Sequence, residues 1–187
     1  MNVIDTIYQR RSIRKYTETL VEQEKIDILL KAAMAAPTAA NCQPWEFIVV
    51  TDSDKLTQVR EKLVFARYKA PAAIVVCGNM KLAFKGLSQE FWVQDCSAAT
   101  ENILLAATSL GLGSVWIGIY PNENNVKAVK GIFNIPTHVT PLSLIYFGYP
   151  AEKKTARTRY NEKRIYQQEY DPERKHRTKN KPVKGHY

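Results

Sequence analysis

Hydrophobic positions along the chain alternate between helical and extended patterns. In the stretch 21–36, apolar residues recur at intervals of three and four, which predicts a helix that ends before Pro37. The stretch 72–79 is almost wholly apolar, which predicts a strand buried on both faces. Further helices are expected at 3–10, 53–63, 90–109 and 125–133, and further strands at 46–52, 113–118 and 142–150.

The longest helical pattern, 90–109, has small and apolar residues on most of its surface. Such a helix is expected to be enclosed on most sides. Either Gly111 or Gly113 is expected to end it in the left-handed conformation. Its predicted buried face consists of Val93, Ser97, Thr100, Ile103, Leu104 and Ala107.

The order of these elements favours a sheet with helices on both sides. About four strands are available, and 187 residues suit one compact domain with a substantial core. Ser53 or Asp54 is expected to cap the helix at 53–63. Residues 151–187 lack a core of their own. We therefore expect Ile165, Tyr166 and Tyr170 to dock elsewhere, for example on a second subunit.

The net charge of +9 lies mostly in the tail, because residues 151–187 hold twelve Lys and Arg against five Asp and Glu. A body shaped for nucleic acid is therefore not implied. No apolar run is long enough for a membrane span, and the N-terminus does not have the pattern of a secretory signal. Three cysteines in no paired motif favour reduced thiols in the cytoplasm, with no metal site.

The stretch "RRSIRKY" at 10–16 concentrates positive charge around Ser12. A solvated helix end, a nucleic-acid contact and a phosphate site all use such residues. A second cluster, "TARTR", contains Arg157 and Arg159. This cluster is either a solvated basic linker or the second half of a phosphate site shared with the first.

Two further stretches combine turn residues with candidate ligand contacts. "APTAANCQPWEF" is either a rigid turn or a loop that offers the amides of Asn41 and Gln43 to a planar heterocycle. "GSVWIG" is either a short buried strand or a backbone segment near a ligand. In the second case Gly118, which lacks a Cβ atom, permits a close approach.

Together and in this order, these stretches resemble the FMN-dependent nitroreductase family. The resemblance runs through nearly the whole chain and includes "WVQDCSAATENILLAATSLGLGSVWIG" and "FGYPAEKKTARTR". It implies an α+β fold with a mostly antiparallel sheet of four to five strands flanked by helices. It also implies that the long helix, with Asp95 and Asn102, lies at a dimer interface.

The resemblance further implies an FMN site at the interface of a homodimer. Residues 1–150 would form the FMN-binding domain, and the basic extension 151–187 would complete the site and wrap around the partner. Arg14 would contact either the flavin N1 edge or the phosphate, and contacts around Phe65–Tyr68 stay open because no matching Asn/Lys pair is present. By position, the implied FMN contacts are Arg10, Arg11, Ser12, Arg14, Pro37, Thr38, Asn41, Gln43, Ile117, Gly118, Arg157 and Arg159.

The implied activity is a ping-pong oxidoreductase cycle in which NADH or NADPH is the reductant. Nitroaromatics, quinones or a related small molecule would be the acceptor. Reductive dehalogenation or flavin fragmentation is the alternative within this fold, and nucleic-acid binding through the tail is a weaker one. No side chain stands out as an acid or base. The sequence also carries no Rossmann fingerprint from which to infer the nicotinamide preference.

Overall fold

A computed structural model describes residues 2–86 and 89–174 of the chain. Its contacts divide the chain into two compact units, 1–156 and 157–187. The expected boundary at residue 150, with a flavin-binding role for the first part, stays a prediction. None of the helices in the described residues is long and apolar enough to cross a membrane.

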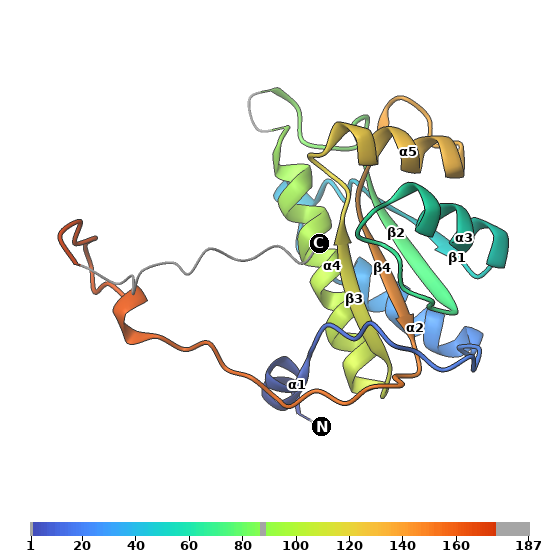
Figure 1. Cartoon of the computed structure of the whole chain (residues 1–187). Helices are drawn as coiled ribbons and strands as arrows, with labels where there is room; N and C mark the ends of the chain where they lie inside the picture. Colours follow the sequence, from blue (N-terminus) through green and yellow to red (C-terminus); the bar gives the residue numbers. More distant parts are fainter. Residues whose placement is uncertain (1, 87–88, 175–187) are drawn as a thin grey trace. The chain divides into compact units, whose positions relative to one another are not determined.

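The first unit is built on one sheet of four antiparallel strands (Figure 1). Its order is β1 (Trp45–Val50), β2 (Ala72–Asn79), β4 (Val139–Gly148) and β3 (Gly113–Gly118). Consecutive strands in the chain are joined by helical connections, so the fold is α+β rather than a meander. The expected antiparallel sheet flanked by helices is thereby confirmed.

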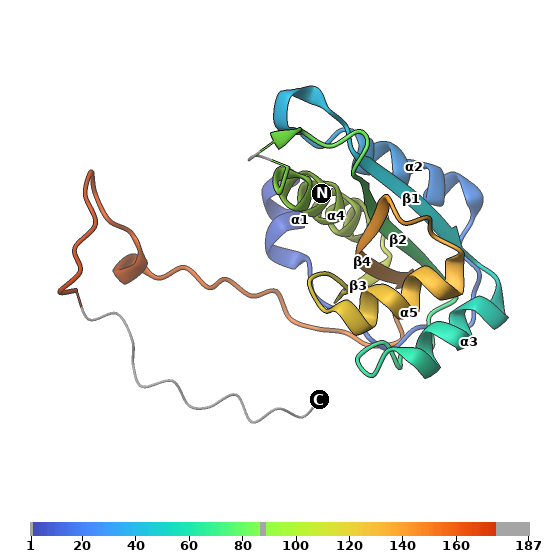
Figure 2. The same ribbon diagram turned by 90° about the horizontal axis from the view of Figure 1, so that it is seen from above.

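Helices cover both faces of this sheet (Figure 2). The helices α2 (Gln23–Met34) and α4 (Phe91–Ser109) pack on one face. The helices α3 (Ser53–Lys62) and α5 (Glu123–Phe133) pack on the other. The short helix α1 (Val3–Gln9) contacts α4.

Strand β2 forms the centre of the core, because both of its faces are buried. Ile74 packs with Leu29 and Ile103 from α2 and α4. Its neighbour Val75 points to the opposite face and packs with Val59 of α3. Side chains alternate between the two faces of a strand, so one continuous apolar run serves both helical layers. The prediction of a strand buried on both sides is confirmed.

Two local expectations needed correction. The N-cap of α3 is Asp52, whose carboxylate accepts from the backbone N–H groups of Asp54 and Lys55, so neither Ser53 nor Asp54 is the cap. On α4, Val93 and Ser97 are only partly buried. The core instead receives Trp92, Asp95, Cys96 and Ala99 together with the predicted Thr100, Ile103, Leu104 and Ala107. The left-handed residue after α4 is Gly111, one of the two expected positions.

The second unit is described as far as residue 174 and contains one short 3₁₀ helix, η3 (Glu162–Arg164). The rings of Tyr166 and Tyr170 stack with their centroids 4.3 Å apart. Ile165 and Tyr170 are exposed, so neither is buried in a core of the tail itself. The end of the basic tail, 175–187, lies outside the described residues.

Candidate functional site

The segment after α1 is anchored to the start of strand β3. Ser12 forms an isolated parallel bridge with Ser114, and the N–H of Ile13 donates to the Ser114 carbonyl at 2.9 Å. The Ile13 side chain is buried against Gly113, where an added Cβ would lie 2.6 Å from it. This buried residue fixes the charged residues on either side of it, so the cluster is not a free helix end.

The segment after β4 runs along the same residues. The N–H of Thr17 donates to Tyr149 and the N–H of Ala151 donates to Lys15, each at 2.9 Å. Glu152 Oε1 accepts from the backbone N–H of Arg14 at 2.6 Å. The structure thus joins the segment 10–17 to residues 149–152, whereas the pairing with Arg157 and Arg159 stays a prediction.

The cationic side chains of the first segment have separate partners. The Arg10 guanidinium lies 3.4 Å from the Glu101 carboxylate on α4. Arg11 donates to the carbonyl oxygen of Thr155. The Arg14 Nε donates to the Tyr68 hydroxyl at 3.2 Å, and its guanidinium lies over the Tyr68 ring. These three arginines therefore contact α4, the segment after β4, and the loop between α3 and β2.

Two carboxyl groups beside this cluster have shifted pKa values, with different causes. The N–H of Arg14 and then the ammonium group of Lys154 hold the pKa of Glu152 below its usual value. Burial raises the pKa of Glu101, and the charge of Arg10 partly opposes that shift.

The loop after α2 carries the four predicted contacts Pro37, Thr38, Asn41 and Gln43. It contains the 3₁₀ turn η1 (Ala39–Asn41), and both amide side chains are exposed. The Gln43 Nε2 donates to Asn41 Oδ1 at 2.8 Å, and the N–H of Gln43 donates to Thr38 Oγ1 at 3.2 Å. The loop is therefore a folded turn with its own hydrogen bonds.

The last two residues of β3 differ in what surrounds them. The Ile117 side chain is buried in the core under α3 and α5. Gly118 is exposed, and a Cβ atom added there would meet no atom within 4 Å. The strand end therefore leaves open space above its backbone, as a nearby ligand requires.

The structure brings some of the predicted residues together and keeps others apart. Arg10 to Arg14 lie at the start of β3, whereas Gly118 lies at its end, about 13 Å along an extended strand. No hydrogen bond within the described residues joins the loop 37–43 to the segment 10–14. Arg157 and Arg159 lie in the second unit, where both are exposed, and their role in a shared phosphate site stays a prediction.

Sequence reasoning missed three residues near the arginine cluster, namely Lys154, Glu152 and Tyr68. Lys154 Nζ donates to the Ser12 carbonyl at 2.6 Å and lies 3.0 Å from Glu152. Tyr68 lies in the region where contacts were left open, and it holds Arg14. Lys154 belongs to the basic stretch "FGYPAEKKTARTR", and its charge there is the signal that could have identified it.

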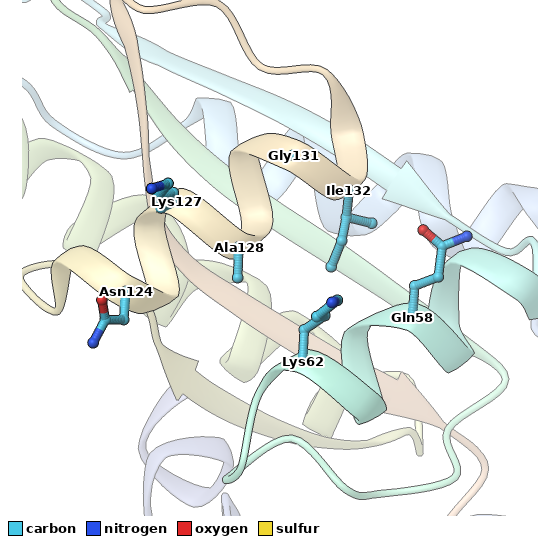
Figure 3. A pocket seen from close by; sticks show the side chains of 7 residues that line it. All are labelled: Gln58, Lys62, Asn124, Lys127, Ala128, Gly131 and Ile132. Carbon is cyan, nitrogen blue, oxygen red and sulfur yellow. The ribbon is translucent and has the colours of Figure 1, made fainter.

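A groove on the other side of the sheet has the size of a ligand pocket but none of the predicted residues. It lies between α3 and α5, has a volume of about 450 Å³, and is lined by residues that include Lys62 and Lys127 (Figure 3). No group of three or more His, Cys, Asp or Glu able to hold a metal occurs among residues 2–86 and 89–174. We therefore place the candidate site at the segment 10–14 and the neighbouring strand β3, outside this groove.

The fold is α+β, and the arginine cluster makes the start of β3 a candidate site for a phosphate-bearing ligand. Residues 7–64 and 60–149 match the model of the Nitroreductase family. A protein of Archaeoglobus fulgidus with the provisional name NADH dehydrogenase/NAD(P)H nitroreductase is 47% identical over 169 residues, which cover 88% of this chain and 96% of the relative. The chain belongs to the nitroreductase family.

Solved structures agree with this assignment. A crystal structure from Parabacteroides distasonis, with the same provisional name, has a TM-score of 0.85 and 43% identity, covering 91% of this chain and 100% of that one. An FMN-dependent nitroreductase of Clostridium difficile has a TM-score of 0.79 and 34% identity, covering 89% and 99% of the two chains. Family and fold thus coincide over nearly the whole chain.

Proposed function

We propose that this protein is an FMN-dependent NAD(P)H oxidoreductase that reduces a small acceptor such as a nitroaromatic compound or a quinone. The observation that carries the proposal is the cluster of Arg10, Arg11 and Arg14 beside Lys154, which is anchored to the start of the strand that ends at the open Gly118. Guanidinium groups suit a phosphate monoester, and an open backbone suits a flat ring. The FMN-dependent relative described above supports the same ligand.

The residues present fit FMN in their chemistry. Arg10, Arg11 and Ser12 would hold the phosphate and ribityl end, with Arg157 and Arg159 as a second pair of guanidinium groups. Bound FMN would supply the two-electron chemistry between NAD(P)H and the acceptor. The backbone of Ile117 and Gly118 would support the ring.

The protein's own contribution is binding, orientation and charge. The phenol of Tyr68 orients Arg14, whose guanidinium is always positive. A fixed cation near the N1 edge of the ring would favour the negative charge that reduction places there. Pro37, Thr38, Asn41 and Gln43 would form a wall with exposed amides. No side chain of the cluster has the arrangement of a general acid or base.

We also propose a homodimer, because a single chain leaves apolar surface and a divided site. Helix α1 exposes Val3, Ile4 and Ile7, with Val3 at 72% exposure. A cavity of about 430 Å³ lies beside it, between α1, α2 and α4, with Leu105 in its lining. A second copy would cover this surface, would accept the exposed Ile165 and Tyr170, and would bring another loop 37–43 to the site.

The free cysteines are compatible with the cytoplasm, where we place the enzyme.

The test is whether purified protein binds flavin and uses it. The protein is expected to be yellow or to become yellow with added FMN, and to oxidise NADH or NADPH when a nitroaromatic acceptor is present. Sedimentation should give twice the chain mass. Protein that stays colourless after FMN addition would overturn the proposal, and flavin-loaded protein that consumes no NAD(P)H would indicate another reaction of the fold.

A further inference from the structure

The loop 37–43 is held in a conformation that its residues do not favour. Ala40, Asn41 and Gln43 all have positive φ angles, of 48°, 55° and 50°. Asn tolerates this left-handed region, whereas Ala40 has no polar side chain to favour it and Gln43 is not a residue that commonly occupies it. The two internal hydrogen bonds of Gln43 span the turn but do not attach it to the protein body. An external restraint is therefore expected.

Helix α4 supplies that restraint. The backbone N–H of Ala39 donates to Asp95 Oδ1 at 2.9 Å. Two helical turns later, Asn102 Nδ2 donates to the carbonyl oxygen of Ala32, in the last turn of α2, at 2.9 Å. Residues seven apart lie on one face of a helix. One face of α4 thus holds both the end of α2 and the loop that follows it.

Asp95 lowers the stability of the fold at this position, because its carboxyl group is buried. It is 5% exposed, and within the part of the chain that the structure describes its second oxygen, Oδ2, has no hydrogen-bond partner. Burial raises the pKa of this carboxyl group, and the N–H of Ala39 opposes that shift. A buried polar atom without a partner is destabilising, so an apolar residue would suit the core better. The presence of this carboxyl group is therefore better explained by its hydrogen bond to Ala39 than by a contribution to the stability of the fold.

The same loop and helix border an open cavity of about 350 Å³. Pro37, Thr38 and Ala39 line it from the loop, and Phe91, Asp95 and Ala98 line it from α4. The shape of this cavity depends on where the loop stands. A ligand at the loop would therefore meet a wall that is already formed, which lowers the ordering cost of binding.

We infer that Asp95 is a positioning residue, which fixes the loop 37–43 in its left-handed turn through Ala39 before any ligand binds. The ligand part of this inference rests on the proposed FMN function. The polar residues of α4 then act within their own chain, in addition to any role of the helix at a dimer interface.

Hydrogen exchange in the flavin-free protein tests the restraint directly. The amide of Ala39 is compared with that of Val75 in β2, which reports global opening. Relative to Val75, exchange at Ala39 should rise about tenfold in Asp95→Ala and in Asp95→Leu, because one hydrogen bond is lost. Asp95→Asn, which keeps an acceptor oxygen, should retain protection. Asp95→Leu branches at the same Cγ position without a polar atom, leaves no cavity, and keeps the test decisive if the alanine variant does not fold.

Asn102→Ala is the matched control, since it removes an equivalent hydrogen bond on the same helix face without touching Ala39. It should leave the Ala39 to Val75 ratio unchanged. FMN affinity, measured by flavin fluorescence, should fall about tenfold in Asp95→Leu and recover in Asp95→Asn. An unchanged Ala39 ratio in both oxygen-free variants would overturn the restraint, and unchanged FMN affinity would overturn its role in binding. If the unsubstituted protein binds no FMN, the proposed function fails, whereas the exchange result still decides the restraint.

Discussion

The ammonium group of Lys154 donates to the carbonyl oxygen of Ser12 at 2.6 Å, across 142 positions of sequence. This bond fixes the backbone of the residue at the centre of the arginine cluster. Lys154 also lies 3.0 Å from Glu152, which accepts from the N–H of Arg14. The shape of the candidate phosphate site therefore depends on residues that bind its backbone as well as on those that would touch the ligand.

The Ser12 hydroxyl is expected to bind FMN, so Ser12→Ala should weaken FMN affinity about tenfold through the loss of one charge-assisted hydrogen bond. Arg159→Ala should weaken it as well if the second arginine pair shares the phosphate. Lys15→Ala is the control, because this side chain is exposed in the same segment. Flavin titration of the three variants measures the effect, and full FMN retention in both Ser12→Ala and Arg159→Ala would show that the phosphate assignment is wrong.

Arg14 is expected to act on the redox potential of the flavin. Removing its charge in Arg14→Met should lower the midpoint potential of bound FMN, because the negative charge of the reduced ring loses a nearby cation. Tyr68→Phe removes the hydroxyl that holds the guanidinium and should give a smaller change in the same direction. A potential unchanged in Arg14→Met, together with weaker FMN binding, would assign Arg14 to the phosphate instead.

Two glycines of β3 should respond in opposite ways to the same change. In Gly113→Ala the new methyl group would lie 2.6 Å from the Ile13 side chain, so stability should fall by about 1–3 kcal/mol. In Gly118→Ala the methyl group would enter open space, so stability should hold while FMN affinity falls. Urea unfolding and flavin titration separate the two effects. Equal FMN affinity in Gly118→Ala and the unsubstituted protein would contradict a ligand above that backbone.

Glu152 should make the stability of the site region depend on acid pH. Its pKa is lower in the folded chain than in the unfolded one, so the unfolded state binds more protons as the pH falls. The stabilisation is present above the usual Glu pKa and is lost as the pH falls through the lowered value. Melting temperatures from neutral to acid pH should therefore fall less steeply in Glu152→Gln. Parallel curves for the two proteins would argue against this ionic contact.

Much of the fold could be predicted because its periodic patterns are local. The apolar runs of β2 and β3 mark those strands, and the glycine at 111 marks the end of α4. Asp52 was passed over as a cap because Ser53 and Asp54 beside it have the same propensity. Only the hydrogen bonds to the backbone N–H groups distinguish these three residues.

The candidate site was less predictable, because its contacts join distant parts of the chain. Charge and spacing pointed to Arg10, Arg11 and Arg14, but the roles of Lys154 and Tyr68 depend on strand pairing that brings far segments together. The restraint from Asp95 was equally hidden, since an aspartate in an apolar helix pattern does not show which backbone group it accepts from.

The segment 10–17 is held in place by β3 and by residues 149–155, which lie far from it in the sequence. A growing chain that ends before residue 149 has its first arginines but not the backbone that fixes them. A fragment that lacks residues 149–155 would therefore keep the arginines in its sequence but lose their fixed arrangement on β3.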